Sequence, residues 1–309
     1  MIALLHGAEK HLTASEVLRW WTWDPLVGLC LGLSGVLYIL GLQRLWASAG
    51  ADRGVRRWEA AAFAAGWLSL FVALVSPLDA LGGVLFSAHM AQHEVLMLIA
   101  APLFVLGRPL VVFLWALPPR GREAVGRWTH RPWVSSGWRA LSGPFVVWAI
   151  HGVALWVWHV PRLYQATLTS DAVHAVQHAS FFGSAALFWW ALIHGRYGRF
   201  GYGVAVAYVF LTGMHSGVLG ALLTFAPSLW YPIYEARTGE WGLSALEDQQ
   251  LAGLIMWVPA GAVFMLLGLA LFAAWLGEAE RRVAFTESER ILSVLETAAL
   301  ETERGIHEA

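Results

Sequence analysis

The sequence predicts an all-α protein that crosses a membrane as a bundle of seven helices. Of its 309 residues, 58% are hydrophobic and 13% are charged, whereas about 25% of the residues in a soluble domain are charged. The chain also has 19 tryptophans, and many lie near the ends of apolar stretches, where amphipathic rings anchor at a lipid interface. These observations favour a multi-pass membrane protein over a soluble domain.

Seven stretches have about the length that a membrane crossing needs. A hydrocarbon core of about 30 Å requires about 20 helical residues. The apolar stretch 109–117 is too short to cross and is followed by Pro118 and Pro119, so we expect an interfacial or re-entrant segment there. The seven expected spans are residues 26–46, 58–76, 82–104, 143–160, 172–193, 203–226 and 249–276.

Basic residues set the expected orientation, because they are retained on the cytoplasmic side. Sixteen of the 20 basic residues lie in or beside three loops and the C-terminal tail, at residues 44–57, 105–142, 194–202 and 277–309. The other four are Lys10, Arg19, Arg162 and Arg237. This distribution places the N-terminus outside and the C-terminus in the cytoplasm.

The same pattern divides the chain into three parts. We expect an extracytoplasmic segment over residues 1–25, a seven-helix transmembrane domain over 26–276 and a cytoplasmic helical tail over 277–309. Ser244 and Glu247 have the spacing of a capping box, which predicts the start of the seventh helix.

Histidines gather in four of the expected spans. A spacing of four residues places His89 with His93, and His174 with His178, on one face of their helices. With a rise of about 1.5 Å per residue and the orientation above, the histidines lie in the outer half of the bilayer or near its centre. The full set is His89, His93, His151, His159, His174, His178 and His215.

Histidines at a matched depth predict a metal site in the membrane. Ionisable groups are costly there and tend to mark function, and imidazole is a ligand for copper, zinc and heme iron. Thioethers at the same depth shift the preference towards Cu(I), and Met97, Met214 and Met256 are placed to supply them. One histidine pair alone is equally well explained by hydrogen bonds between helices, and single methionines are more often packing residues. The candidate ligands are therefore the seven histidines and these three methionines.

The sequence gives little support to an enzyme or a nucleic-acid-binding protein. It contains no phosphate-binding glycine loop, GxSxG elbow or HExxH motif, and its single cysteine, Cys30, excludes a CxxC motif. Its 20 basic and 21 acidic residues nearly balance. The roles of five residues stay open between packing, capping and contact with a cation: Cys30, Asp79, Glu94, Glu247 and Asp248.

Three other functions remain open from the residues alone. Histidines on facing helices could ligate b-type heme, although each HxxxH pair lies on one helix. A copper transporter would need ligands that continue into the cytoplasmic half, where His194 is the only candidate. A scaffold that docks another subunit and binds nothing would leave the matched depth of the histidines unexplained.

Several segments resemble the CtaG-type cytochrome c oxidase assembly factors of bacteria, over roughly residues 20–276. The most specific segment is Trp230-Tyr231 followed by Trp241–Ser244 and Glu247–Trp257. The others are Trp23-x-Pro25, Ser76-Pro77-Leu78-Asp79, the helix with His89 and His93, and His159-x-Pro161-x-x-Tyr164 with His174 and His178.

The resemblance implies a non-enzymatic, multi-pass protein of the bacterial inner (plasma) membrane that is needed to form active heme–copper oxidase. It implies a role in delivering or inserting copper, with oxidase subunits as partners, membrane lipid around the bundle and a second copper chaperone as a further partner. Combined with the histidine pattern, it leads us to expect Cu(I) at an outer-half site, with b-type heme as the alternative cofactor.

Overall fold

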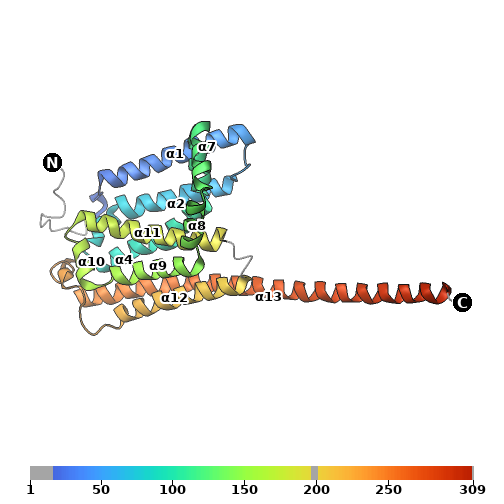
Figure 1. Cartoon of the computed structure of the whole chain (residues 1–309). Coiled ribbons are helices and arrows are strands. Elements are labelled where there is room, and N and C mark those ends of the chain that lie inside the picture. The colour runs from blue at the N-terminus through green and yellow to red at the C-terminus, as the bar shows by residue number, and fades with distance from the viewer. Residues whose placement is uncertain (1–16, 196–200, 308–309) are drawn as a thin grey trace.

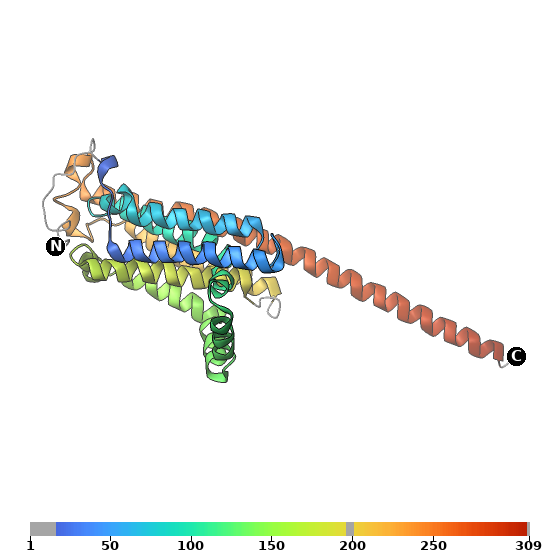
Figure 2. The same ribbon diagram turned by 90° about the horizontal axis from the view of Figure 1, so that it is seen from above.

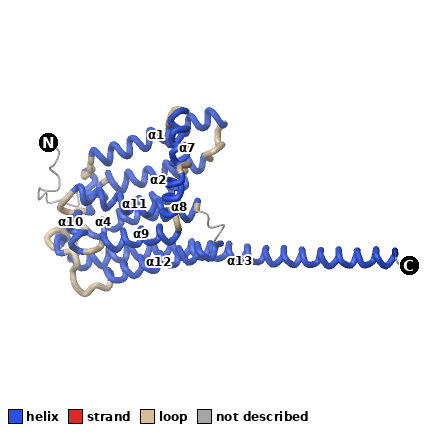
Figure 3. Tube along the Cα trace, in the orientation of Figure 1, coloured by secondary structure: helices blue, strands red, loops and turns tan. Residues whose placement is uncertain are grey.

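The computed structural model describes residues 17–195 and 201–307, and every element within them is a helix. The long helices run side by side as a bundle, and the last helix continues far beyond the others towards the C-terminus (Figures 1 and 2). Figure 3 shows that loops gather at the ends of the bundle. The expected all-α class is therefore confirmed for the described residues.

Six long helices and one composite helix form the bundle. The long helices are α1 (Pro25–Ala49), α2 (Arg57–Val75), α9 (Pro144–Trp158), α11 (Asp171–His194), α12 (Gly201–Thr224) and α13 (Ala245–His307). The composite helix consists of α4 (Phe86–Glu94), the π-helical turn η2 (Val95–Ala100) and α5 (Ala101–Leu106).

Short helices connect these elements. They are η1 (Val17–Arg19), α3 (Pro77–Gly82), α6 (Pro109–Ala116), α7 (Pro119–Thr129), α8 (Pro132–Leu141), α10 (Pro161–Thr167), η4 (Pro232–Tyr234) and η5 (Gly239–Trp241). Figure 1 shows α7 crossing the direction of the bundle axes, while α10 lies at the opposite end.

Prolines and polar caps fix the helix starts. Proline opens α1, α9 and most of the short helices, where the backbone N–H that it lacks would have no helical partner. The Asp24 carboxylate accepts hydrogen bonds from the N–H groups of Leu26 and Val27. The predicted capping box is confirmed, because Ser244 Oγ accepts from Glu247 N at 3.3 Å and Glu247 Oε2 accepts from Ser244 N at 2.8 Å.

The predicted spans all fall on helices, but fewer than seven of these helices are long and apolar enough, by length and composition alone, to cross a membrane. In the part of the chain that the structure describes, five helices are long and apolar enough to cross a membrane, and the pair α8 and α9, bent by 61°, could add a sixth. The 24 residues of α11 suffice in length, yet α11 is not in this group. Its first turns carry Asp171, His174 and His178, which lower its mean hydropathy.

The stretch 109–117 forms the short helix α6, which packs on α1. The contact is close, since a Cβ atom added to Gly41 would lie 2.0 Å from the carbonyl oxygen of Val112. The Tyr38 hydroxyl donates a hydrogen bond of 2.7 Å to the carbonyl of Gly107, two residues before the start of α6. At eight residues α6 is too short to cross, as predicted.

The main core lies among the composite helix, α9, α11, α12 and α13. The Phe188 and Tyr208 rings stack with centroids 4.7 Å apart, and the Trp189 indole N–H donates to the carbonyl of Met97 at 2.8 Å. This core holds α4 against α11 and α13. Large apolar side chains such as Leu29 and Phe145 instead face outward, as expected for helices surrounded by lipid.

The last helix passes through residue 277 without a break. Helix α13 continues as one helix to His307, and Val283, Phe285 and Leu292 are exposed along its extension. The tail that the sequence predicts to be helical is therefore helical, and it leaves the bundle as a continuation of the last helix (Figure 2).

Candidate metal centre

Four of the predicted ligands meet between α4 and α11. On α4 the His89 and His93 rings have centroids 4.3 Å apart, and on α11 the His174 and His178 rings are 4.1 Å apart. Across the two helices, His89 lies 5.5 Å from His174 and His93 lies 5.4 Å from His178. The two pairs of histidines spaced by four residues therefore face each other.

Three of these histidines have the arrangement of a metal site. One ring nitrogen from each of His89, His174 and His178 lies within 4.8 Å of the other two. Ligands at about 2.0 Å from one ion in a trigonal plane would be about 3.5 Å apart, so a contraction of at most about 1.3 Å would close the site. The three donors are imidazole nitrogens, which copper and zinc accept. The residues present thus fit a small metal ion.

Unsatisfied polar atoms surround this position. Among the described residues, neither ring nitrogen of His93 has a hydrogen-bond partner, and Nε2 of His178 also has none. His93 is 2% exposed. Buried polar atoms are nearly always hydrogen-bonded, so these nitrogens are available to a ligand such as an ion or a water molecule.

His159 adjoins the cluster from the end of α9. Its ring nitrogen Nδ1 lies 2.6 Å from the carbonyl oxygen of Leu155, so Nδ1 carries the proton and donates it, and Nε2 holds the lone pair. Nε2 is buried without a partner in the described part of the chain. The Phe181 ring is near both His93 and His159, with centroids 4.5 Å and 6.3 Å away. His159 is thus a buried neighbour of the cluster.

The other two predicted histidines lie elsewhere in the bundle. Nδ1 of His151 lies 3.0 Å from Ser184 Oγ on α11, and the His215 ring contacts Trp148 with centroids 5.7 Å apart. Ser184 follows His178 by six residues, a rise of about 9 Å along the helix. The predicted set of seven histidines is therefore divided between two levels.

Comparison with known proteins places the chain in a family. A family model for the cytochrome c oxidase caa3 assembly factor matches residues 36–278. The chain belongs to this family. The resemblance inferred from the sequence is thereby confirmed, and the protein is a member of an oxidase assembly factor family.

Two mycobacterial relatives are longer than this family member. An uncharacterised protein of Mycobacterium bovis is 27% identical over 288 residues, covering 89% of this chain and 42% of the relative. An uncharacterised protein of Mycobacterium leprae is 26% identical over 277 residues, covering 86% of this chain and 41% of the relative. The chain thus spans about two fifths of the length of the curated relatives it matches. No solved structure gives a significant match.

The predicted methionines of this family member differ in their burial. Met97 and Met256 are buried in the main core, whereas the Met214 side chain is 50% exposed on α12. Met97 follows His93 by four residues, but the π-helical turn η2 begins at Val95 and interrupts the α-helical stripe. Such π-helical turns often occur at functional sites.

A cap of tyrosines covers the cluster at the end of the bundle near α10. The Tyr164 ring stands edge-on to His89, with centroids 5.1 Å apart. The Tyr164 and Tyr234 hydroxyls are 2.8 Å apart, and Tyr234 donates to the carbonyl of Gly82 at 2.8 Å. Tyr231 donates to the carbonyl of His159. Burial raises the pKa of Tyr164 and of Tyr234, so the cap is uncharged at neutral pH.

Polar residues that the sequence left open hold α4 in place. The buried Asp248 carboxylate accepts hydrogen bonds from the backbone N–H groups of Phe86 and Ser87. Gln92 donates to Asp79 Oδ1 and to the carbonyl of Ala73, both at 2.7 Å. A capping residue on the same helix has a recognisable spacing, but a cap supplied from 162 residues away has none.

The remaining open residues have different surroundings. The Glu247 carboxylate accepts from the backbone N–H of Ser244 in the capping box of α13, and Cys30 is exposed on α1. Glu94 directly follows His93, and among the described residues its Oε2 atom is buried without a hydrogen-bond partner.

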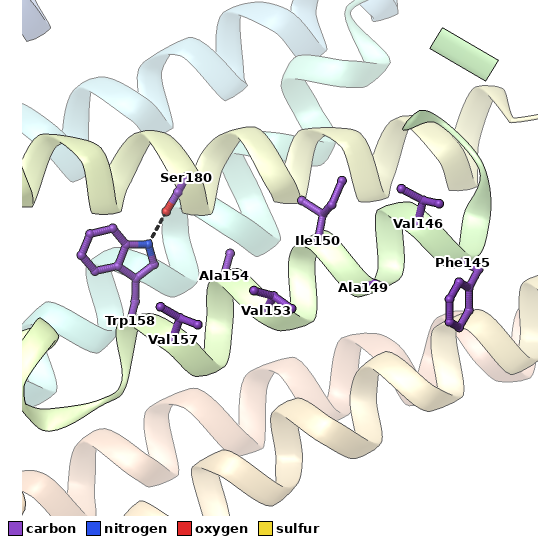
Figure 4. A pocket seen from close by; sticks show the side chains of 9 residues that line it. All are labelled: Phe145, Val146, Ala149, Ile150, Val153, Ala154, Val157, Trp158 and Ser180. Carbon is purple, nitrogen blue, oxygen red and sulfur yellow. Dashed lines mark hydrogen bonds between the residues drawn. The ribbon is translucent and has the colours of Figure 1, made fainter. Parts of the chain in front are cut away.

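An apolar groove runs along the outside of α9. Figure 4 shows its lining by α9 side chains from Phe145 to Trp158 and by Ser180 of α11. The Trp158 indole N–H donates to the Ser180 hydroxyl at 2.5 Å. The lining contains no imidazole, carboxylate or sulfur, so the histidine cluster rather than the groove is the candidate metal centre.

Proposed function

We propose that this assembly factor binds copper as Cu(I) at the histidine cluster and delivers it to the heme–copper oxidase that it helps to assemble. The ligands are His89, His174 and His178, with His93 and His159 alongside. One observation carries the proposal: three ring nitrogens from two facing helices approach within 4.8 Å of one another. Oxidase subunits are the receiving partners, and a second copper chaperone is a source of the ion.

The character of the ligands favours a monovalent ion. All are imidazoles, which bind a metal in the neutral form, and a buried ion with a single charge costs less desolvation free energy than a divalent one. Copper(I) also accepts few ligands, whereas structural zinc requires four. A site of low coordination suits transfer, because a new ligand can join before an old one leaves.

The packing of the rings argues against the heme alternative. A b-type heme would take one histidine from each side of its plane, with the macrocycle between the two rings. Here the His89 and His174 rings are nearly parallel at 27° with centroids 5.5 Å apart, and His93 also contacts Phe181. The approach of these rings leaves no slot for a porphyrin between them.

We further propose the seven-crossing topology in the bacterial inner membrane. Helix α11 and the bent pair α8 and α9 add one crossing each to the five apolar spans, which gives seven. Helix α11 can cross although it is more polar, because lipid-facing helices can surround a polar interior. The arginine-rich segment 119–139 and the tail then lie in the cytoplasm, and the tyrosine cap lies on the extracytoplasmic side.

Reporter fusions test this orientation. Alkaline phosphatase fused after residue 307 should be inactive and a fluorescent protein at that point should be bright; the reverse result would contradict this orientation.

Copper binding is tested on the full-length protein in detergent. We expect the wild type to take up Cu(I) in competition with a chromogenic chelator, without a Soret band in its visible spectrum. The double variants His89→Ala/His93→Ala and His174→Ala/His178→Ala should lose the ion held by the cluster. His130→Ala, at the C-terminal end of α7, is the matched control and should bind as the wild type does.

Two results would overturn the proposal. Full copper stoichiometry in both double variants would exclude the cluster as the site. A strong Soret band with iron in the purified protein would favour the membrane cytochrome instead. Oxidase assembly should fail in cells that carry either double variant, and this failure links the binding site to delivery.

A further inference from the structure

We infer that His151 and His215 form a second Cu(I) station, separate from the cluster and deeper in the bundle. This inference rests on the proposed function and extends it from one ion to two. His151 lies on α9 and His215 on α12, and both helices pack together. The ligand would be a monovalent soft metal ion held between two imidazoles.

A hydrogen-bond chain fixes the proton of His151. The Ser184 hydroxyl donates to the carbonyl of Phe181 at 3.3 Å, so its oxygen accepts from Nδ1–H of His151 at 3.0 Å. The lone pair of His151 is therefore on Nε2. Metal-binding histidines are commonly oriented in this way, by donating the other ring N–H to a fixed acceptor. His151 is 7% exposed, which keeps water from competing for that lone pair.

His215 presents unsatisfied nitrogens beside this position. Within the described residues, both of its ring nitrogens and the indole nitrogen of Trp148 are buried without a hydrogen-bond partner. The imidazole faces α9, because a Cβ atom added to Gly152 would lie 3.6 Å from Nε2 of His215. Gly152 directly follows His151. An ion between the two helices would satisfy a lone pair that has no partner among the described residues.

The two stations are too far apart to share one ion. His151 precedes His159 by eight residues on α9, a rise of about 12 Å. On α11 Ser184 follows His178 by six residues, a rise of about 9 Å, and Phe181, between them in sequence, packs against His93. A bound ion has ligands at about 2 Å, so each level would hold its own. Two neutral nitrogens suit two-coordinate Cu(I) better than zinc, which requires four ligands.

Counting the bound ions in matched variants tests this inference. Full-length protein in detergent is titrated with Cu(I) under anaerobic, reducing conditions against a chromogenic chelator. We expect two ions for the wild type and for His130→Ala, one for His151→Ala/His215→Ala, and one for His89→Ala/His178→Ala. The ion that remains in His89→Ala/His178→Ala should show the X-ray absorption edge of linear two-coordinate Cu(I).

The outcomes separate the two proposals. One ion in the wild type, lost only in the cluster variant, would overturn the second station and leave the proposed function intact. Loss of all copper in His151→Ala/His215→Ala, with no loss in the cluster variant, would overturn the cluster instead. Should the alanine variants misfold, His215→Gln preserves a polar side chain of similar size, and two ions bound to that variant would also overturn the second station.

Discussion

Asp248 Oδ2 accepts a hydrogen bond of 2.6 Å from the backbone N–H of Phe86, the first residue of α4. Oδ1 of the same carboxylate accepts from the N–H and the hydroxyl of Ser87. Helix α4 has no capping side chain of its own, so an acid on α13 serves its N-terminus, where negative charge is favourable. This contact fixes the start of the helix that carries His89 and His93.

Replacing Asp248 should therefore loosen the metal site as well as the fold. Asp248→Ala leaves three donors near α4 unsatisfied, and each buried unsatisfied group costs about 1–3 kcal/mol. We expect a clearly lower melting temperature in detergent and weaker Cu(I) binding at the cluster. Glu247→Ala is the neighbouring control, because it removes only the exposed carboxylate of the α13 capping box and should change the melting temperature far less. Equal losses in the two variants would contradict the role given to Asp248.

Removing the Tyr234 hydroxyl should lower the stability of the protein more than removing the Tyr164 hydroxyl. Tyr234 donates to the carbonyl of Gly82, so the Tyr164 hydroxyl is the donor in their shared hydrogen bond. Tyr234→Phe leaves both the Gly82 carbonyl and the Tyr164 hydroxyl unsatisfied, whereas Tyr164→Phe leaves only an acceptor on Tyr234. We expect Tyr234→Phe to destabilise the protein more, by about 1–3 kcal/mol, in thermal unfolding of the purified protein. The opposite order would show that the donor assignment is wrong.

Alkaline pH should destabilise the folded protein through the same tyrosines. Burial is the largest cause that raises the pKa of Tyr164 and of Tyr234 above the ordinary value in the folded protein. In the unfolded chain, tyrosine ionises at about pH 10. The unfolded state then binds fewer protons, so stability is complete below about pH 10 and falls above it, by about 1.4 kcal/mol per pH unit for each tyrosine. Melting temperatures between about pH 8 and about pH 11 should fall less steeply in Tyr164→Phe/Tyr234→Phe.

The contact between α1 and α6 should tolerate no side chain at Gly41. An added Cβ atom would lie 2.0 Å from the Val112 carbonyl oxygen and 2.8 Å from its carbon, so the backbones would have to separate. Gly41→Ala should destabilise the protein by about 1–3 kcal/mol, as overpacking does. Among the described residues, Gly28→Ala on the same helix meets nothing within 4 Å and should be neutral or slightly stabilising. Similar melting temperatures for the two variants would refute the close contact.

The sequence predicted which segments become helices, because that information is local. The apolar stretches match α1, α2, α9, α11 and α12 closely, and the prolines and the Ser244 capping box mark real helix starts. The composite helix shows where local information stops. It begins at Phe86 rather than residue 82, because α3 ends first, and it contains the turn η2, which the spacing of His93 and Met97 does not reveal.

The pairing of His89 with His93 and of His174 with His178 was also predictable from the sequence, since one helical turn fixes each pair. Packing between helices was needed to show that these pairs face each other, that His151 and His215 lie at another level, and that Met214 is half exposed. Depth along a helix follows from residue number and a constant rise. The direction in which a side chain faces depends on which helices are neighbours, and that order is set by packing between residues far apart in the chain, such as Asp248 and Phe86.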